Sequence, residues 1–215
     1  PLHLASSNGL EGVESTLLEN NANINATNKL KMTPLHLATS KGHANVVQIL
    51  LDNNANVNEP DFHNNTPLHY ASMEGRDTIV NMLLDKDAYM NMKNNDGNMP
   101  LHYVSSSGSD TIVRMLLDKD ANLIMNEKDN LGNTPLHLAS SVGHENIVRM
   151  LLEKKANMNM KNNEGNTPLN LAIDRNHNNI VEMLMEENAG ATNKNTEYYK
   201  SLLENKKLLY ETNHM

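Results

Sequence analysis

Histidine is the residue whose type and spacing most suggest chemistry, because imidazole nitrogens bind metal ions and exchange protons near neutral pH. It recurs at His3, His36, His69, His102 and His137. A row of histidines could form a metal ladder. However, neighbouring helices pack about 8–10 Å apart, whereas zinc–nitrogen bonds are about 2 Å long and the ligands must converge on one ion. We therefore predict that the histidines are structural, with no metal site and no cofactor.

Other catalytic residue types give no better site. The tripeptides Asp85-Lys86-Asp87 and Asp118-Lys119-Asp120 pair carboxylates, but both fall at the expected end of a helix, where a solvated turn is the simpler interpretation. The sequence has no Cys, no glycine-rich phosphate loop, and no Ser/His/Asp arrangement beyond its repeated residues. We therefore predict no catalytic residues and no enzyme activity.

The histidines belong to a repeated hexapeptide, best seen in Thr134-Pro135-Leu136-His137-Leu138-Ala139. The threonine is a good helix N-cap and the proline a good first helical residue. The histidine, three residues after the threonine, can complete a capping box. A glycine such as Gly143 then suits the helix end, and an apolar stripe predicts a second helix.

The copies begin at prolines spaced 33 or 35 residues apart, which predicts one unit built repeatedly. These prolines are Pro1, Pro34, Pro67, Pro100, Pro135 and Pro168. Two short helices cannot bury their apolar faces alone, so the units must stack.

The hexapeptide, its following glycine, the apolar second helix and the Ala-Asn-x-Asn turn together resemble the ankyrin repeat. The best copies are 33–38 with Gly42, 66–71 with Gly75, and 134–139 with Gly143. The resemblance implies an all-α solenoid of stacked helix-turn-helix units joined by hairpin-like turns. The expected repeats are 1–26, 27–60, 61–93, 94–128, 129–161 and 162–191.

The two ends depart from the pattern. We expect residues 192–215 to form a C-terminal capping helix and tail, because the last repeat of a solenoid needs a polar outer face; a partner-binding tail is the alternative. Pro1 falls inside the hexapeptide, so we expect the chain to be a fragment. Repeat one carries Glu14-Ser15-Thr16 where later repeats are more apolar, and we expect it to be irregular.

Repeat four also departs from the pattern. Met99 replaces the threonine cap, Val104 replaces a small alanine, and the following turn is two residues longer, near 123–125. We therefore predict that the junction between repeats four and five is the least stable. In repeat six, Asn170 replaces the histidine and Asn176 the glycine.

Composition and charge argue against nucleic-acid binding and membrane insertion. The net charge of −8 argues against nucleic acid, which needs clustered Lys and Arg. No apolar run approaches the roughly 20 residues of a membrane span. The absence of Cys fits a reducing compartment, and we expect a cytoplasmic or nuclear monomer.

The resemblance implies a protein-interaction scaffold that binds its partner on a concave face of hairpin tips and first helices. By position, the candidate contacts are Lys29, Leu30, Met32, Phe62, His63, Asn65, Met73, Glu74, Asn95, Asp96, Asn98, Asn130, Leu131 and Asn133. Phe62 is the only Phe and a candidate anchor; alternatively, its ring folds over its own repeat. Further positions on this face are Lys41, Ser107, Val142, Glu164 and Arg175.

Two other interpretations stay open. The chain could be the regulatory arm of a larger enzyme or channel. In addition, the turn residues Asn58, Asn91 and Asn159 match the asparagine that hydroxylases modify in some ankyrin proteins, although turn geometry alone also accounts for an asparagine there.

Overall fold

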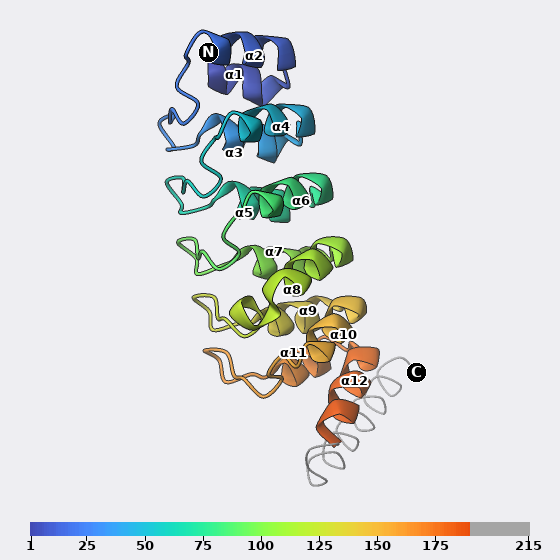
Figure 1. The fold of residues 1–215 in the computed structure, drawn as a ribbon. Coiled ribbons are helices and arrows are strands. Elements are labelled where there is room, and N and C mark those ends of the chain that lie inside the picture. Colours follow the sequence, from blue (N-terminus) through green and yellow to red (C-terminus); the bar gives the residue numbers. More distant parts are fainter. Residues whose placement is uncertain (190–215) are drawn as a thin grey trace, which may run out of the picture.

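The computed structural model describes residues 1–189, and there the chain forms six pairs of antiparallel helices stacked in one column (Figure 1). We call the odd-numbered helices first helices and the even-numbered ones second helices. Their bounds are α1 Leu2–Asn8, α2 Glu11–Glu19, α3 Pro34–Lys41, α4 Ala44–Asp52, α5 Pro67–Met73, α6 Asp77–Asp85, α7 Pro100–Ser107, α8 Asp110–Ile124, α9 Pro135–Val142, α10 Glu145–Glu153, α11 Pro168–Asp174 and α12 Asn178–Ala189.

The stack confirms the predicted all-α solenoid. Each first helix packs on the first helix of the next pair, and the described second helices form a parallel layer. The loops from each second helix to the next first helix all project to one side (Figure 1). We call these loops hairpins, although residues 1–189 contain no strand. Each predicted repeat contains one helix pair, and the predicted cap at 192–215 lies outside the described residues.

The first helices begin with the capping pattern that the hexapeptide predicts. The backbone N–H of Thr66 donates to Nδ1 of His69 at 3.1 Å, and the proline that follows is the first residue of α5. The same bond, at 3.1–3.2 Å, is made to His36, His102 and His137. In repeat six, the Asn170 amide oxygen replaces the imidazole and accepts the Thr167 N–H at 2.9 Å.

Met99 weakens the N-terminal cap of α7 less than the sequence predicts. Its backbone N–H still donates to Nδ1 of His102 at 3.2 Å, so the histidine half of the cap remains. Its side chain is fully buried, and burying an apolar side chain is worth about 1.5–3 kcal/mol. Val104 is likewise fully buried in the core. The departures at these two positions are therefore compensated by core packing.

The first residues of the long turn expected after Asp120 are helical and form the end of α8, which corrects the expectation of a turn there. Asp120 has non-helical angles (φ −161°, ψ 88°), and the chain then makes a further helical segment to Ile124. Ile124 is completely buried and Met125 nearly so. The two extra residues therefore add a kink and a buried apolar side chain.

Repeat one forms both helices but buries its second helix differently. Val13 is 48% exposed, whereas the equivalent side chains of later repeats are at most 2% exposed; these are Val46, Ile79, Ile112, Ile147 and Ile180. Glu14 occupies a position that is Val in later repeats and is fully buried, with one carboxylate oxygen accepting the Ser6 hydroxyl at 2.8 Å. Burial raises the pKa of Glu14.

Candidate protein-binding surface

The hairpin tips are organised by one Asn or Asp side chain each. Its Oδ1 accepts the backbone N–H groups two and four residues later, at 2.7–3.1 Å, as in an Asx turn. The organising residues are Asn28, Asp61, Asn94, Asp129 and Asn162. We call residues 28–32, 61–65, 94–98, 129–133 and 162–166 the tips. Because each tip closes on its own side chain, its shape is fixed before any partner binds.

The tips are joined to one another by the backbone. The N–H of Phe62 donates to the Leu30 carbonyl at 2.9 Å, and that of Asn95 to the His63 carbonyl at 3.0 Å. The next two junctions repeat this bond at 3.0 Å, from Asn130 to Asp96 and from Asn163 to Leu131. The five tips therefore form one continuous row along the stack.

Asparagine side chains reinforce this row. The Asn130 amide donates to the Asn95 carbonyl at 2.8 Å, and the Asn163 amide to the Asn130 carbonyl at 2.9 Å. A side chain at Gly97 would collide with this arrangement, since its Cβ would lie 2.7 Å from the Asn130 backbone nitrogen. Gly97 also has φ +76°, a conformation that glycine adopts without strain.

The hexapeptide histidines cap the first helices, as predicted, and they also link neighbouring repeats, which the sequence did not predict. Since Nδ1 accepts a backbone N–H, Nε2 carries the hydrogen of a neutral ring and donates it to a carbonyl of the following hairpin at 3.0–3.1 Å. Burial lowers the pKa of His36, His102 and His137, and it lowers that of His69 to about 4.

A second histidine series, which the sequence did not reveal as a link, runs in the opposite direction. Nε2 of His43 lies 3.1 Å from the Ser7 carbonyl of the preceding repeat, and His144 and His177 make the same contact to Ser106 and Ser141 at 3.0 and 3.1 Å. Their only sequence signal is their place just after the helix-ending residue. Each imidazole covers the glycine that ends the first helix of the preceding repeat. A Cβ at Gly108, for example, would lie 2.6 Å from His144.

Two tyrosines on the first helices also stabilise the tips. The Tyr70 hydroxyl donates to the buried Asp61 carboxylate at 2.7 Å, and the Tyr103 hydroxyl accepts the Asn94 amide at 2.7 Å. Burial raises the pKa of both tyrosines. These two tips are thus anchored to α5 and α7.

Asn65 is a correction to the predicted contact residues. It is only 7% exposed, its side-chain oxygen accepts the Asn94 amide at 2.9 Å, and its carbonyl lies 3.1 Å from Nε2 of His36. Met32, Asn98 and Asn133 are half-buried. Asn98 and Asn133 occupy the position equivalent to Asn65, and the Asn133 side-chain oxygen likewise accepts the Asn162 amide, at 2.9 Å.

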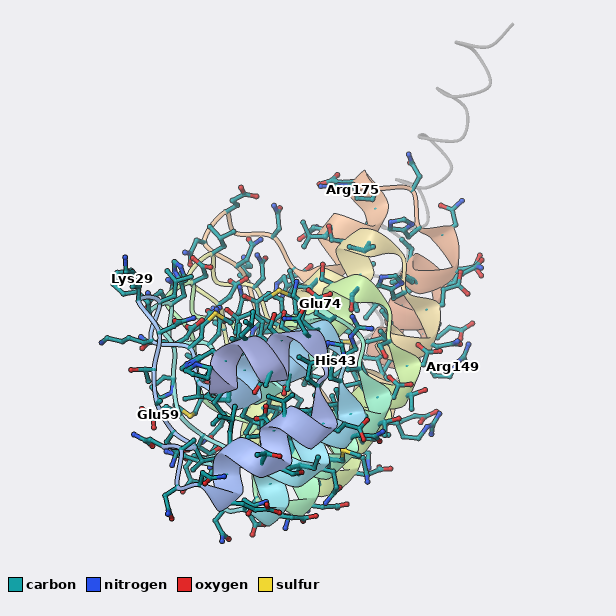
Figure 2. The ribbon with its side chains drawn as sticks, turned by 90° about the horizontal axis from the view of Figure 1, so that it is seen from above. Lys29, His43, Glu59, Glu74, Arg149 and Arg175 are labelled. Atoms are coloured by element: carbon teal, nitrogen blue, oxygen red, sulfur yellow. The ribbon has the colours of Figure 1, made fainter. Side chains whose placement is uncertain are left out.

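The remaining predicted residues are exposed: Lys29, Leu30, Phe62, His63, Met73, Glu74, Asn95, Asp96, Asn130 and Leu131. Leu30, Phe62 and Leu131 are 53%, 60% and 69% exposed. Because Phe62 is this exposed, its ring is not buried under its own repeat; it contacts His63 edge-on, with ring centroids 5.4 Å apart. In the view along the stack, Lys29 lies on the side of the tips and Glu74 lies near the first helices. Arg149 projects from the side opposite the tips (Figure 2).

An open groove of about 180 Å³ lies between the last two tips and the helices behind them. Its apolar lining consists of Leu131, Leu138 and Leu171. Glu164 also lines the groove. The polar remainder consists of Asn133, Ser141, Asn162 and Asn163.

Other candidate features have weaker support. Among residues 1–189, no three His, Asp or Glu side chains cluster so as to hold a metal ion. No helix in the same range is both long and apolar enough to cross a membrane. Of the turn asparagines, Asn58 accepts the Tyr89 N–H at 2.8 Å, whereas Asn91 and Asn159 are exposed.

A family model described as ankyrin repeats matches residues 2–94, 87–162 and 123–198. The chain belongs to the ankyrin repeat family. No match to a curated protein sequence was found. Among solved structures, the human ASB11 ankyrin repeat domain is 27% identical with a TM-score of 0.78, over 90% of this chain and 84% of that one. An ankyrin repeat domain from Acinetobacter baumannii AYE is 29% identical with a TM-score of 0.81, over 87% and 97%. Ankyrin repeats are generally protein–protein interaction modules without catalysis.

Proposed function

We propose that this ankyrin repeat protein is a non-catalytic scaffold whose concave surface, made of the tips and the exposed sides of the first helices, binds a protein partner. The observation that carries the proposal is the row of exposed apolar side chains Leu30, Phe62 and Leu131 on tips whose backbones are mutually hydrogen-bonded. A rigid surface loses little conformational entropy on binding, and aromatic side chains are favoured anchors.

The proposal is tested by substituting the anchors after a partner has been isolated by affinity capture. The double variant Leu30→Ala with Phe62→Ala should weaken binding at least tenfold in titration calorimetry, because two apolar contacts are lost. The matched control is Tyr89→Ala with Leu123→Ala, which removes two exposed apolar side chains outside the tips. Equal affinities for both double variants and the unsubstituted chain, across every captured partner, would refute the concave site.

The regulatory-arm alternative is favoured by one observation. Leu4, Leu10 and Val13 are 68%, 46% and 48% exposed on repeat one, which leaves an apolar end face where another domain could pack. The test is the complete coding sequence together with the activity of any attached domain. An attached enzyme or channel whose activity changes when residues 1–189 are deleted would support this function, whereas unchanged activity would exclude it.

The proposed scaffold acts as a cytoplasmic or nuclear monomer and binds no nucleic acid. Light scattering would measure its mass, and binding to DNA or RNA that falls steeply with salt would contradict the last point.

A further inference from the structure

We infer that the groove between repeats five and six receives one apolar side chain of the partner, followed or preceded by a Lys or Arg that pairs with Glu164. The inference rests on the proposed function and adds the chemistry of one contact to it. Leu131 comes from the tip of repeat five, Leu138 from α9 and Leu171 from α11, so three apolar side chains from three elements surround one space.

The size of the groove fits a single side chain. Its volume is about 180 Å³, and a cavity of about 150 Å³ lined by apolar side chains holds a benzene ring. Leu138 and Leu171 are partly buried and fixed on helices, whereas Leu131 is 69% exposed at the outer edge. A Leu, Met or Phe side chain entering the groove would cover Leu131 and remove apolar surface from water.

Charge identifies the neighbouring residue of the partner. No Lys, Arg or His nitrogen within residues 1–189 lies within 4 Å of the Glu164 carboxylate, which receives only the Asn166 amide, at 3.3 Å. Lys128, at the base of the preceding hairpin, is directed elsewhere, since its ammonium donates to the Lys161 carbonyl at 2.7 Å. Glu164 therefore offers an unneutralised carboxylate beside an apolar groove.

The charges of the whole tip row agree with this assignment. The first tip carries Lys29 and Lys31, whereas Asp96 and Glu164 are exposed on later tips. The row thus changes from basic to acidic along the stack. Because opposite charges steer association and like charges oppose it, the basic part of the partner lies over repeats four to six.

The experiment is an NMR titration of the full chain carrying labelled leucine methyl groups. The probe is the blocked tetrapeptide acetyl-Gly-Leu-Arg-Gly-amide at millimolar concentration, since so small a ligand binds weakly. We expect saturable shifts at the methyls of Leu131, Leu138 and Leu171. The matched probes acetyl-Gly-Ser-Arg-Gly-amide and acetyl-Gly-Leu-Glu-Gly-amide should bind at least threefold more weakly, because each lacks one of the two contacts.

Two variants at exposed positions keep the test independent of folding. Leu131→Ser should weaken binding of the Leu-Arg probe severalfold, and Glu164→Gln should weaken it about two- to fivefold and remove most of its salt dependence. Leu123→Ser, a substitution of an exposed leucine outside the tips, should leave the affinity unchanged.

The possible failures separate this inference from the scaffold function. Shifts confined to Leu30 and its surroundings would overturn the groove while supporting a concave site. Equal binding of the Leu-Arg and Leu-Glu probes would overturn the role of Glu164. No shift at any leucine would overturn the inference, and the Leu30/Phe62 experiment would then decide the scaffold function by itself.

Discussion

Nε2 of His69 lies 3.1 Å from the carbonyl oxygen of Asn98, so the first helix of repeat three is hydrogen-bonded to the hairpin of repeat four. The same imidazole accepts the N–H of Thr66 through Nδ1. One neutral ring therefore serves a cap and a repeat junction together, and its protonation would disrupt the cap because Nδ1 could no longer accept.

The histidine links should make stability depend on pH. Burial lowers the pKa of His69 to about 4, whereas an unfolded histidine titrates near 6.5. Between these values the unfolded chain binds more protons, so the free energy of unfolding is highest above pH 6.5 and falls as pH falls toward 4. His69 alone accounts for a loss of about 3 kcal/mol at the acidic end. Urea unfolding from pH 7.5 to 4.5 would measure it, and a flat profile would contradict it.

Substitutions at His69 should separate its two roles. Asn170 shows that an asparagine can accept the cap N–H, so His69→Asn should keep the cap and lose only the bond to Asn98, at a cost of about 1 kcal/mol. His69→Ala should cost about 2–3 kcal/mol, because the cap and the packing are lost as well. Equal unfolding free energies for the two variants in urea would show that the inter-repeat bond, and not the cap, dominates.

Gly97→Ala should destabilise the protein more than Gly165→Ala. Both glycines have positive φ, +76° and +82°, so both variants incur the strain of a left-handed alanine, about 1–2 kcal/mol. At Gly97 the new Cβ would also lie 2.7 Å from the Asn130 nitrogen, whereas at Gly165 nothing described lies within 4 Å. An additional loss of about 1–3 kcal/mol is expected at Gly97. Thermal unfolding of the pair would reveal it, and identical midpoints would count against the tip contact.

Ile124→Ala should be costly although the residue lies in an insertion. Ile124 is completely buried, and truncating such a side chain costs about 2–5 kcal/mol. Its neighbour Leu123 is 44% exposed, so Leu123→Ala should change stability by less than about 1 kcal/mol. Denaturant midpoints would compare them, and similar losses would mean that the insertion does not pack as described.

Amide hydrogen exchange should show residues 99–126 less protected than repeats two and three. In a linear stack, each repeat contacts only its neighbours, so a weak junction opens locally. Met99 and Val104 are buried, and the weakness therefore depends mainly on the kink at Asp120. Better protection of 99–126 than of the earlier repeats would overturn the prediction.

The fold was predictable because local and long-range signals agree in most copies. The Thr-Pro start, the histidine at the third helical position and the apolar second helix each favour the same unit. The site was less predictable. The exposure of Leu30 and Phe62 follows from their place in a turn, but the burial of Asn65 depends on His36 of the preceding repeat and Asn94 of the next hairpin.

Tertiary contacts also account for the features that the sequence missed. His43 precedes a helix in the sequence, yet its partner is the Ser7 carbonyl in another repeat. Ile124 looks like a turn residue, but it becomes helical because its side chain enters the core. Neither the contact of His43 nor the burial of Ile124 can be read from the spacing of the motif.

The kink at Asp120 has a consequence for how such arrays diversify. Although this unit is two residues longer than its neighbours, the bond from Asn130 to Asp96 is 3.0 Å, the same as the bond from Asn95 to His63 in a unit of ordinary length. The added length is accommodated behind the row of tips. A partner on the proposed surface would therefore meet an even spacing. Selection could lengthen or shorten the rear of a unit without changing that surface.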